Sequence, residues 1–203
     1  MKIYSFSHFG YEGALVTVEV DLRRGIPAID IVGLADSAVK ESRERMQAAI
    51  RNSGFQFPLE RVLISLSPAD LRKEGAGFDL PVALGVLAAG AQNAGLNSFI
   101  SEPILVMGEL ELSGNIRGVK GVHAAVATAV SCGITRCIVP VQNADEAREV
   151  NGAIVCGAEK LEDAFRALSD ISFFESRLPL SKAGNLPAGC EETPYRNGRN
   201  GHG

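Results

Sequence analysis

Residues 62–91 read VLISLSPADLRKEGAGFDLPVALGVLAAGA, and this stretch predicts how the chain folds. Its apolar run at 62–66 is long enough for one strand, which ends before Pro68. A polar turn with glycines follows at 70–79, and the apolar and small residues at 80–91 predict a buried helix. Many folds hold functional residues in a loop of this kind, because the flanking strand and helix fix its position.

The composition is that of a globular protein. Apolar residues make up 46% of the chain and charged residues 22%, which is close to the average for domains that form a core. A length of 203 residues predicts one domain, or one domain with a tail. The net charge of −4 excludes a generally basic, nucleic-acid-binding character, although a local basic patch is compatible with it.

The cysteines predict neither disulfides nor a zinc site, because they are irregularly spaced and form no Cys-x-x-Cys pair. They are Cys132, Cys137, Cys156 and Cys190. This usage is typical of a reducing cytoplasm. The N-terminus has no apolar run behind Lys2, and no segment reaches the roughly 18 apolar residues of a membrane span. We therefore expect a cytoplasmic protein without a membrane partner or a bound metal.

Three strands are predicted before the first helix. Residues 3–9 and 29–32 have strand character, and residues 14–22 alternate, with Val16, Val18, Val20 and Leu22 inward. Short turns that contain glycine separate the three strands. Such connections predict an antiparallel meander.

The first helix is predicted to begin after Gly33, with Asp36 or Ser37 as its N-cap. Its apolar residues recur at helical spacing and form one stripe, which consists of Val39, Met46, Ala49 and Ile50. The Asn-Ser-Gly sequence at 52–54 predicts its end.

Beyond Gly95 strands and helices alternate with short connections, which predicts parallel or mixed pairing. The expected strands are 104–107, 137–139 and 153–155, the expected helices are 122–130, 143–150 and 160–168, and a hairpin tip is expected at 112–116. From about residue 174 the chain is rich in Pro, Gly, Asn and Ser and lacks periodicity. We therefore expect one domain at 1–172 and a disordered tail or linker at 173–203.

Three segments together resemble a known family. They are VGLADSAVKESRERMQAAIRNSGF (32–55), SPADLRKEGAGFDLPVALGVLAA (67–89) and MGELELSGNIRGVKGV (107–122). In this order they resemble the N-terminal domain of the YifB/ComM family of magnesium-chelatase-like AAA+ proteins, over roughly residues 3–168. The resemblance implies an α+β fold similar to the proteolytic domain of Lon. Its core order is β-β-β-α-β-α, with additional αβ elements and helices packed on a mixed sheet.

In intact family members an AAA+ ATPase module follows this domain, and the resemblance implies ATP and magnesium for that module only. A Walker A loop, G-x-x-x-x-G-K-[ST], uses its lysine to hold phosphates, and no Gly-Lys dipeptide occurs in the 203 residues. We therefore expect no cofactor and no ATP hydrolysis in this chain. The implied partners are the AAA+ module and further copies, as a hexamer at full length, with DNA as another candidate.

Lon-type proteolysis uses a serine that a lysine activates. The resemblance places the serine position at Ala76 or Gly77 and the lysine position near His123, with Lys120 close by. Neither residue at the first position carries a nucleophile. We therefore expect no peptidase activity.

The glycine-containing turn has a structural interpretation. We expect Gly75 and Gly77 to supply positive φ angles or a close approach, and Asp79 to cap the helix that starts at Leu80. The pair of glycines alone does not make a phosphate-binding loop, because the further glycine and the lysine are missing.

Basic residues are concentrated between residues 40 and 73. The candidate contacts to nucleic acid or to another subunit are Arg43, Arg45, Arg51, Arg72 and Lys73. Glutamates at 41, 44, 60 and 74 are interleaved with them, so a solvated face of paired charges is the alternative.

The resemblance therefore implies a non-catalytic module that assists ring assembly or DNA engagement, in a family that processes DNA during natural transformation. A DNA-binding domain in its own right and a degenerate Lon-type peptidase are the alternatives.

Overall fold

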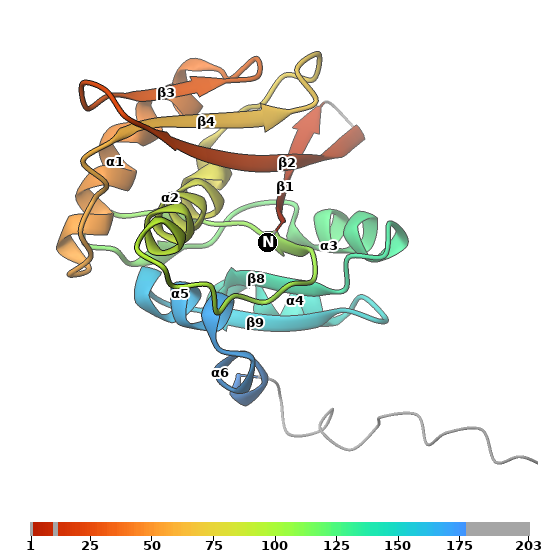
Figure 1. Cartoon of the computed structure of the whole chain (residues 1–203). Coiled ribbons are helices and arrows are strands. Elements are labelled where there is room, and N and C mark those ends of the chain that lie inside the picture. The colour runs from red at the N-terminus through yellow and green to blue at the C-terminus, as the bar shows by residue number, and fades with distance from the viewer. Residues whose placement is uncertain (1, 10–11, 178–203) are drawn as a thin grey trace, which may run out of the picture.

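The computed structural model describes residues 2–9 and 12–177. Within these ranges seven strands form one mixed sheet in the spatial order β3-β4-β2-β1-β5-β8-β9 (Figure 1). Its strands are β1 (Ile3–Phe9), β2 (Glu12–Arg23), β3 (Ile29–Val32), β4 (Arg61–Ser67), β5 (Ile104–Val106), β8 (Arg136–Pro140) and β9 (Ile154–Ala158). A separate hairpin consists of β6 (Glu109–Leu110) and β7 (Ile116–Arg117).

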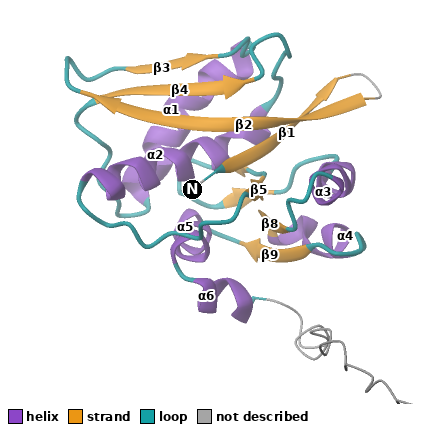
Figure 2. Ribbon diagram, turned by 45° about the vertical axis from the view of Figure 1, so that its right-hand side comes forward, coloured by secondary structure: helices purple, strands orange, loops and turns teal. Residues whose placement is uncertain are grey.

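Helices cover both faces of the sheet, as Figure 2 shows. The helices are α1 (Ser37–Asn52), α2 (Asp79–Asn93), α3 (Val122–Ser131), α4 (Ala144–Arg148), α5 (Leu161–Ser169) and α6 (Ile171–Ser176). The 3-10 turns η1 (Ala76–Phe78) and η2 (Val141–Asn143) precede α2 and α4. The predicted α+β class and the order β-β-β-α-β-α are confirmed.

Two apolar cores form because successive side chains of a strand point to opposite faces. In β5, Ile104 and Val106 pack with α1, α2 and α5, whereas Leu105 packs with α3 and α4 on the other face. Helix α2 is buried from Asp79 to Ala88, which confirms the buried helix that residues 80–91 predict. The sheet and its two helix layers therefore hold the segment that follows β4 on a rigid base.

The predicted antiparallel meander is wrong for its third strand. Strands β1 and β2 pair antiparallel, but β3 pairs with β4 in parallel, and β4 lies between β3 and β2. The physical reason is that α1 connects β3 to β4, and a strand–helix–strand crossover returns the chain to a parallel neighbour. The seven-residue register of β4 with β2, from Thr17↔Ser67 to Arg23↔Arg61, then occupies the edge of β2.

The other predicted elements are confirmed, with boundaries that shift by a few residues. Pairing in the second half is parallel between β1, β5, β8 and β9, as the alternation of strands and helices predicts. Helix α6 extends past the predicted boundary at residue 172, and Phe174 is fully buried in the first core. Most of the predicted tail, residues 178–203, lies outside the described residues.

In the part of the chain that the structure describes, no helix has both the length and the apolar character needed to cross a membrane.

Candidate functional site

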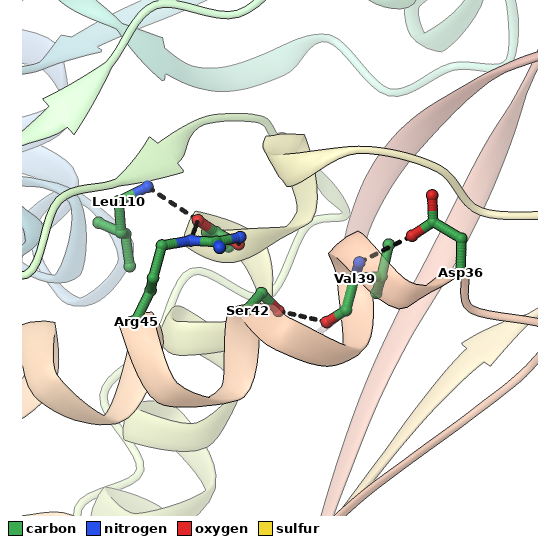
Figure 3. A network of polar contacts seen from close by, with 6 residues as sticks. Asp36, Val39, Ser42, Arg45 and Leu110 are labelled. Atoms are coloured by element: carbon green, nitrogen blue, oxygen red, sulfur yellow. Dashed lines mark hydrogen bonds and ion pairs between the residues drawn. The ribbon is translucent and has the colours of Figure 1, made fainter.

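The segment between β4 and α2, residues 68–78, is named the glycine loop below. Its backbone is fixed against the start of α1: the Lys73 N–H donates to the Leu34 carbonyl at 3.2 Å, and the Asp36 N–H donates to the Lys73 carbonyl at 3.1 Å. The Asp36 carboxylate accepts from Val39 N–H at 2.7 Å, which confirms it as the N-cap of α1 (Figure 3). Its second oxygen accepts from Gly75 N–H at 3.4 Å. One carboxylate therefore joins the helix start to the loop.

Lys73 is fully buried, so its predicted role as a surface contact to nucleic acid or to a subunit is wrong. Its Nζ donates a hydrogen bond to the Pro68 carbonyl inside the same loop. Burial lowers the pKa of the Lys73 ammonium, while the nearby Asp70 carboxylate acts in the opposite direction. Sequence reasoning places lysines on the surface by default, and Lys73 departs from this rule because the loop folds over its side chain.

The prediction that Asp79 caps α2 is wrong, because Asp79 is the first residue of the helix and its side chain forms a buried ion pair with α1. Arg45 donates to its two oxygens from Nε at 3.0 Å and from Nη2 at 3.1 Å, and the Leu110 N–H donates at 3.2 Å. Figure 3 labels two of these partners, Arg45 on α1 and Leu110 on β6, and dashed lines mark hydrogen bonds and ion pairs between the residues drawn. Burial raises the pKa of Asp79, and the Arg45 guanidinium opposes this shift. The candidate contact Arg45 therefore serves as an internal link between three elements.

The two glycines of the loop have different backbone requirements. Gly75 has φ 85° and ψ 176°, a conformation that is essentially restricted to glycine, so the predicted positive φ is confirmed there. Gly77 has no positive φ, and a Cβ placed on it would lie 4.0 Å from Val119 Cγ1, its nearest neighbour. Gly77 thus supplies neither a positive φ nor a close approach, because η1 continues there with ordinary helical geometry.

The two segments that the resemblance to Lon pairs do lie side by side. Gly77 lies next to Val119. The Val119 N–H donates to the Asn143 side-chain oxygen at 2.9 Å, and the Asn143 side-chain amide donates to the Val119 carbonyl at 2.8 Å. The exposed side chains of Lys120 and His123 have no polar partner among the described residues. The two segments therefore meet in the fold, and the serine position at Ala76 or Gly77 stays a prediction. Asn143 was not singled out from sequence, since nothing local marks a contact 24 residues away.

The glycine loop does not fit a nucleotide phosphate. The lysine of the loop points inward to the Pro68 carbonyl, and the exposed Arg72 forms an ion pair with Glu74 at 3.0 Å. The loop residues therefore offer no free cation in the position that a phosphate loop requires.

The remaining predicted basic contacts are exposed but do not form one patch. Arg43 donates to the carbonyls of Lys40 and Ile29 at 3.0 and 3.2 Å, and both Arg43 and Arg51 line a groove beside α1. Arg72 belongs to the glycine loop and is paired with Glu74. The role of Arg43, Arg51 and Arg72 in contacting DNA or a subunit stays a prediction.

The cysteines of the described residues are free thiols. Burial raises the pKa of Cys137 to about 12 and that of Cys156 to about 11, so both stay protonated and act as small core residues. Within residues 2–9 and 12–177, no group of three or more His, Cys, Asp or Glu side chains is arranged to hold a metal ion.

Comparisons with known proteins match this chain to one family and to parts of longer proteins. Residues 18–143 match the family described as subunit ChlI of Mg-chelatase. Competence protein ComM of Haemophilus influenzae is 37% identical over 179 residues, which cover 88% of this chain and 34% of ComM. The uncharacterised YifB of Escherichia coli is 38% identical over 150 residues, with 74% and 29% covered.

An uncharacterised protein of Mycobacterium tuberculosis is 38% identical over 160 residues, which cover 79% of this chain and 31% of that protein. The chain thus spans about a third of the length of the curated relatives that it matches. The family match covers more than half of this chain. The chain belongs to the magnesium-chelatase ChlI family, and it corresponds to the N-terminal domain of the YifB/ComM-type proteins.

Proposed function

We propose that this domain is a non-catalytic module of a magnesium-chelatase-like protein, in which it assists the assembly of the ring. The observation that carries the proposal is the state of the glycine loop. Neither Ala76 nor Gly77, the residues at the expected serine position, carries a nucleophile. A Ser–Lys mechanism needs a hydroxyl and a free amine within hydrogen-bond reach of each other. The loop lacks the hydroxyl that such a mechanism requires.

The relatives support a role within a longer protein. ComM, YifB and the mycobacterial relative are each about three times the length that this chain matches, and ComM is named a competence protein. We propose that ATP and magnesium act in the part of such proteins outside the matched segment. The domain then contributes contacts, and the rest of the ring contributes the chemistry on DNA.

The test is a pair of assays on the purified 203-residue chain. We expect no release of phosphate from ATP with magnesium and no cleavage of casein, while full-length Haemophilus influenzae ComM in the same buffers turns over ATP. Phosphate release by the short chain, proportional to its concentration and retained through a second purification step, contradicts the proposal. Casein cleavage that persists in the presence of inhibitors of contaminating proteases contradicts it as well.

DNA binding by the domain itself is the second candidate, and the exposed Arg43 and Arg51 on α1 favour it. Phosphate contacts make binding depend on salt, with an affinity that falls as ionic strength rises. Fluorescence anisotropy with single- and double-stranded oligonucleotides therefore tests it. Binding that weakens with salt and with the double change Arg43→Glu/Arg51→Glu supports DNA binding. Absent or salt-independent binding rules it out.

A further inference from the structure

Two grooves lie side by side at the end of the molecule where α1 and α2 finish, and this region is named the grooved end. The first groove, of about 790 Å³, lies between residues 27–29 and the exposed face of α1. The second, of about 560 Å³, lies against the C-terminal half of α2 and includes Phe165. Residues 55–60 line both grooves, so this segment forms the ridge that separates them.

The grooved end carries the three most exposed large apolar side chains among the described residues. Ile26 is 85% exposed, Leu59 is 83% exposed and Leu96 is 64% exposed. Leu59 stands on the ridge, Leu96 lines the second groove, and Ile26 precedes Pro27 of the first groove. Apolar side chains that gather around one concave surface indicate an interaction site, whereas isolated ones do not.

The charges of the first groove are balanced. Arg43 and Arg51 line it together with Glu44 and Glu60. Arg43, Arg51 and Glu44 have no ion-pair partner among the described residues, and Glu60 accepts only from the Asn93 amide at 2.9 Å. A polyanion would meet two carboxylates here, which disfavours DNA. Glu44 and Arg51 lie seven residues apart on α1 and line the same groove, so an antiparallel twofold pairing of two α1 helices sets each charge against its opposite.

We propose that the grooved end is a contact between two copies of this chain. In a twofold arrangement the α1 helices lie antiparallel, Leu59 of each copy enters a groove of the other, and Arg51 of one copy meets Glu44 of the second copy. A ridge beside a groove supplies the shape that such an isologous interface needs. A twofold contact joins two copies and does not by itself close a ring of subunits, so the inference goes beyond the proposed role in ring assembly, and the surface of this chain alone decides the test.

Sedimentation equilibrium of the purified chain over a wide range of concentrations provides the test. We expect a monomer–dimer equilibrium with a Kd in roughly the micromolar range, since small interfaces between soluble domains are weak. Leu59→Glu is expected to raise the Kd by at least about tenfold, because it places a charge in an apolar contact. Leu34→Glu is the matched control, because Leu34 is exposed and lies before α1, outside both grooves.

Charge reversal tests the arrangement itself. Arg51→Glu and Glu44→Arg are each expected to weaken the dimer, and the double variant is expected to restore it, because the two charges exchange places across the interface. Lys40→Glu, on the same helix but outside both grooves, leaves the equilibrium unchanged.

Three outcomes overturn the inference. One is a monomer at all concentrations up to about 500 µM, beyond the range of a specific weak contact. Another is a dimer that Leu59→Glu leaves intact. The third is an oligonucleotide complex that forms in place of the dimer and that Arg51→Glu abolishes, which assigns the groove to DNA. None of these outcomes bears on the ATPase and peptidase assays, so the two proposals fail separately.

Discussion

Lys73 and Asp79 lie fully buried at the glycine loop, each with partners inside the domain, whereas Arg51 and Leu59 of the grooved end face solvent. Both regions contact α1 or its start, and both contain charged residues that look alike in the sequence. The difference is in how the charges are satisfied. Gly75 of the loop donates to Asp36 before α1, and the adjoining Asp79 joins α2 to α1 and β6. The polar groups of the grooved end are left available for other contacts.

This difference distinguishes a loop that supports the fold from a surface that is available for contacts. The loop has the position of an active site in the fold, but its polar side chains stabilise the domain. The grooved end has no motif that sequence inspection would select, because its residues come from three separate connections. We infer that the contacts of this domain with other proteins are made away from the loop that organises its fold.

The largest expected effect comes from breaking the buried ion pair. Asp79→Ala is expected to lower the free energy of unfolding by about 3 kcal/mol, because it leaves Arg45 and the Leu110 N–H without their acceptor. Arg45 is 29% exposed, so water partly compensates the loss. Urea denaturation followed by circular dichroism measures the change. Arg72→Ala, which breaks the exposed pair with Glu74, is the control and costs less than about 0.5 kcal/mol. Equal losses in the two variants contradict the assignment.

The next effect distinguishes the two glycines of the loop. Gly75→Ala is expected to destabilise the domain by about 2 kcal/mol, because its φ and ψ are those of a conformation that side chains disfavour. Gly77→Ala is expected to change stability by less than about 0.5 kcal/mol, since its backbone is ordinary and space is open around its Cβ. Gly77→Ser should also fold, because the space around the Cβ of residue 77 is open. If Gly77→Ala lowers the free energy of unfolding as much as Gly75→Ala does in the same urea titration, the account is contradicted.

A smaller effect is expected in the pH dependence of stability. Burial lowers the pKa of Lys73 in the folded state below the ordinary value of 10.5, so the protonated form is penalised by folding. The penalty is complete below the folded pKa and disappears as pH rises toward 10.5. The stability of the wild type relative to Lys73→Met should therefore increase from neutral pH into the alkaline range. Lys40→Met, at an exposed position, provides the control. A difference between wild type and Lys73→Met that stays constant with pH shows that Lys73 is solvated.

The smallest effect on stability is expected at the grooved end. Leu59→Glu and Arg51→Glu should each change the free energy of unfolding by less than about 0.5 kcal/mol, because neither side chain has a partner in the core. Thermal denaturation at low protein concentration, where the dimer is dissociated, measures this. If either variant lowers the free energy of unfolding by several kcal/mol, these residues stabilise the fold, and the grooved end does not differ from the loop in this respect.

The sequence predicts the elements of this fold well because their signals are local. The alternation in β2 and the apolar stripe of α1 report burial directly, and Asp36 is recognised as an N-cap from its neighbours. The partner of β3 is not predictable in this way, since the choice between β2 and β4 depends on a register 30 or more residues distant. The sequence also gives no sign that helix α6 continues the domain beyond residue 172.

The candidate site shows the same limit more strongly. The positive φ of Gly75 is predictable, because glycine adopts such a conformation readily. The partner of Asp79, however, lies 34 residues away, and the burial of Lys73 depends on how the loop closes. The grooved end is invisible in the sequence, because residues 26, 59 and 96 become neighbours of the same two grooves only after folding. The partner of a charged side chain is set by tertiary contacts, which the composition does not reveal.

Sedimentation equilibrium of three proteins, the wild type, Leu59→Glu and Arg72→Glu, tests the contrast most directly. Both substitutions place a glutamate at an exposed position, one on the ridge of the grooved end and one in the glycine loop. We predict that the wild type and Arg72→Glu form the dimer with similar Kd values and that Leu59→Glu stays monomeric at the same concentrations. A dimer that Arg72→Glu dissociates and Leu59→Glu leaves intact would show that the glycine loop makes the contact, and would contradict the account.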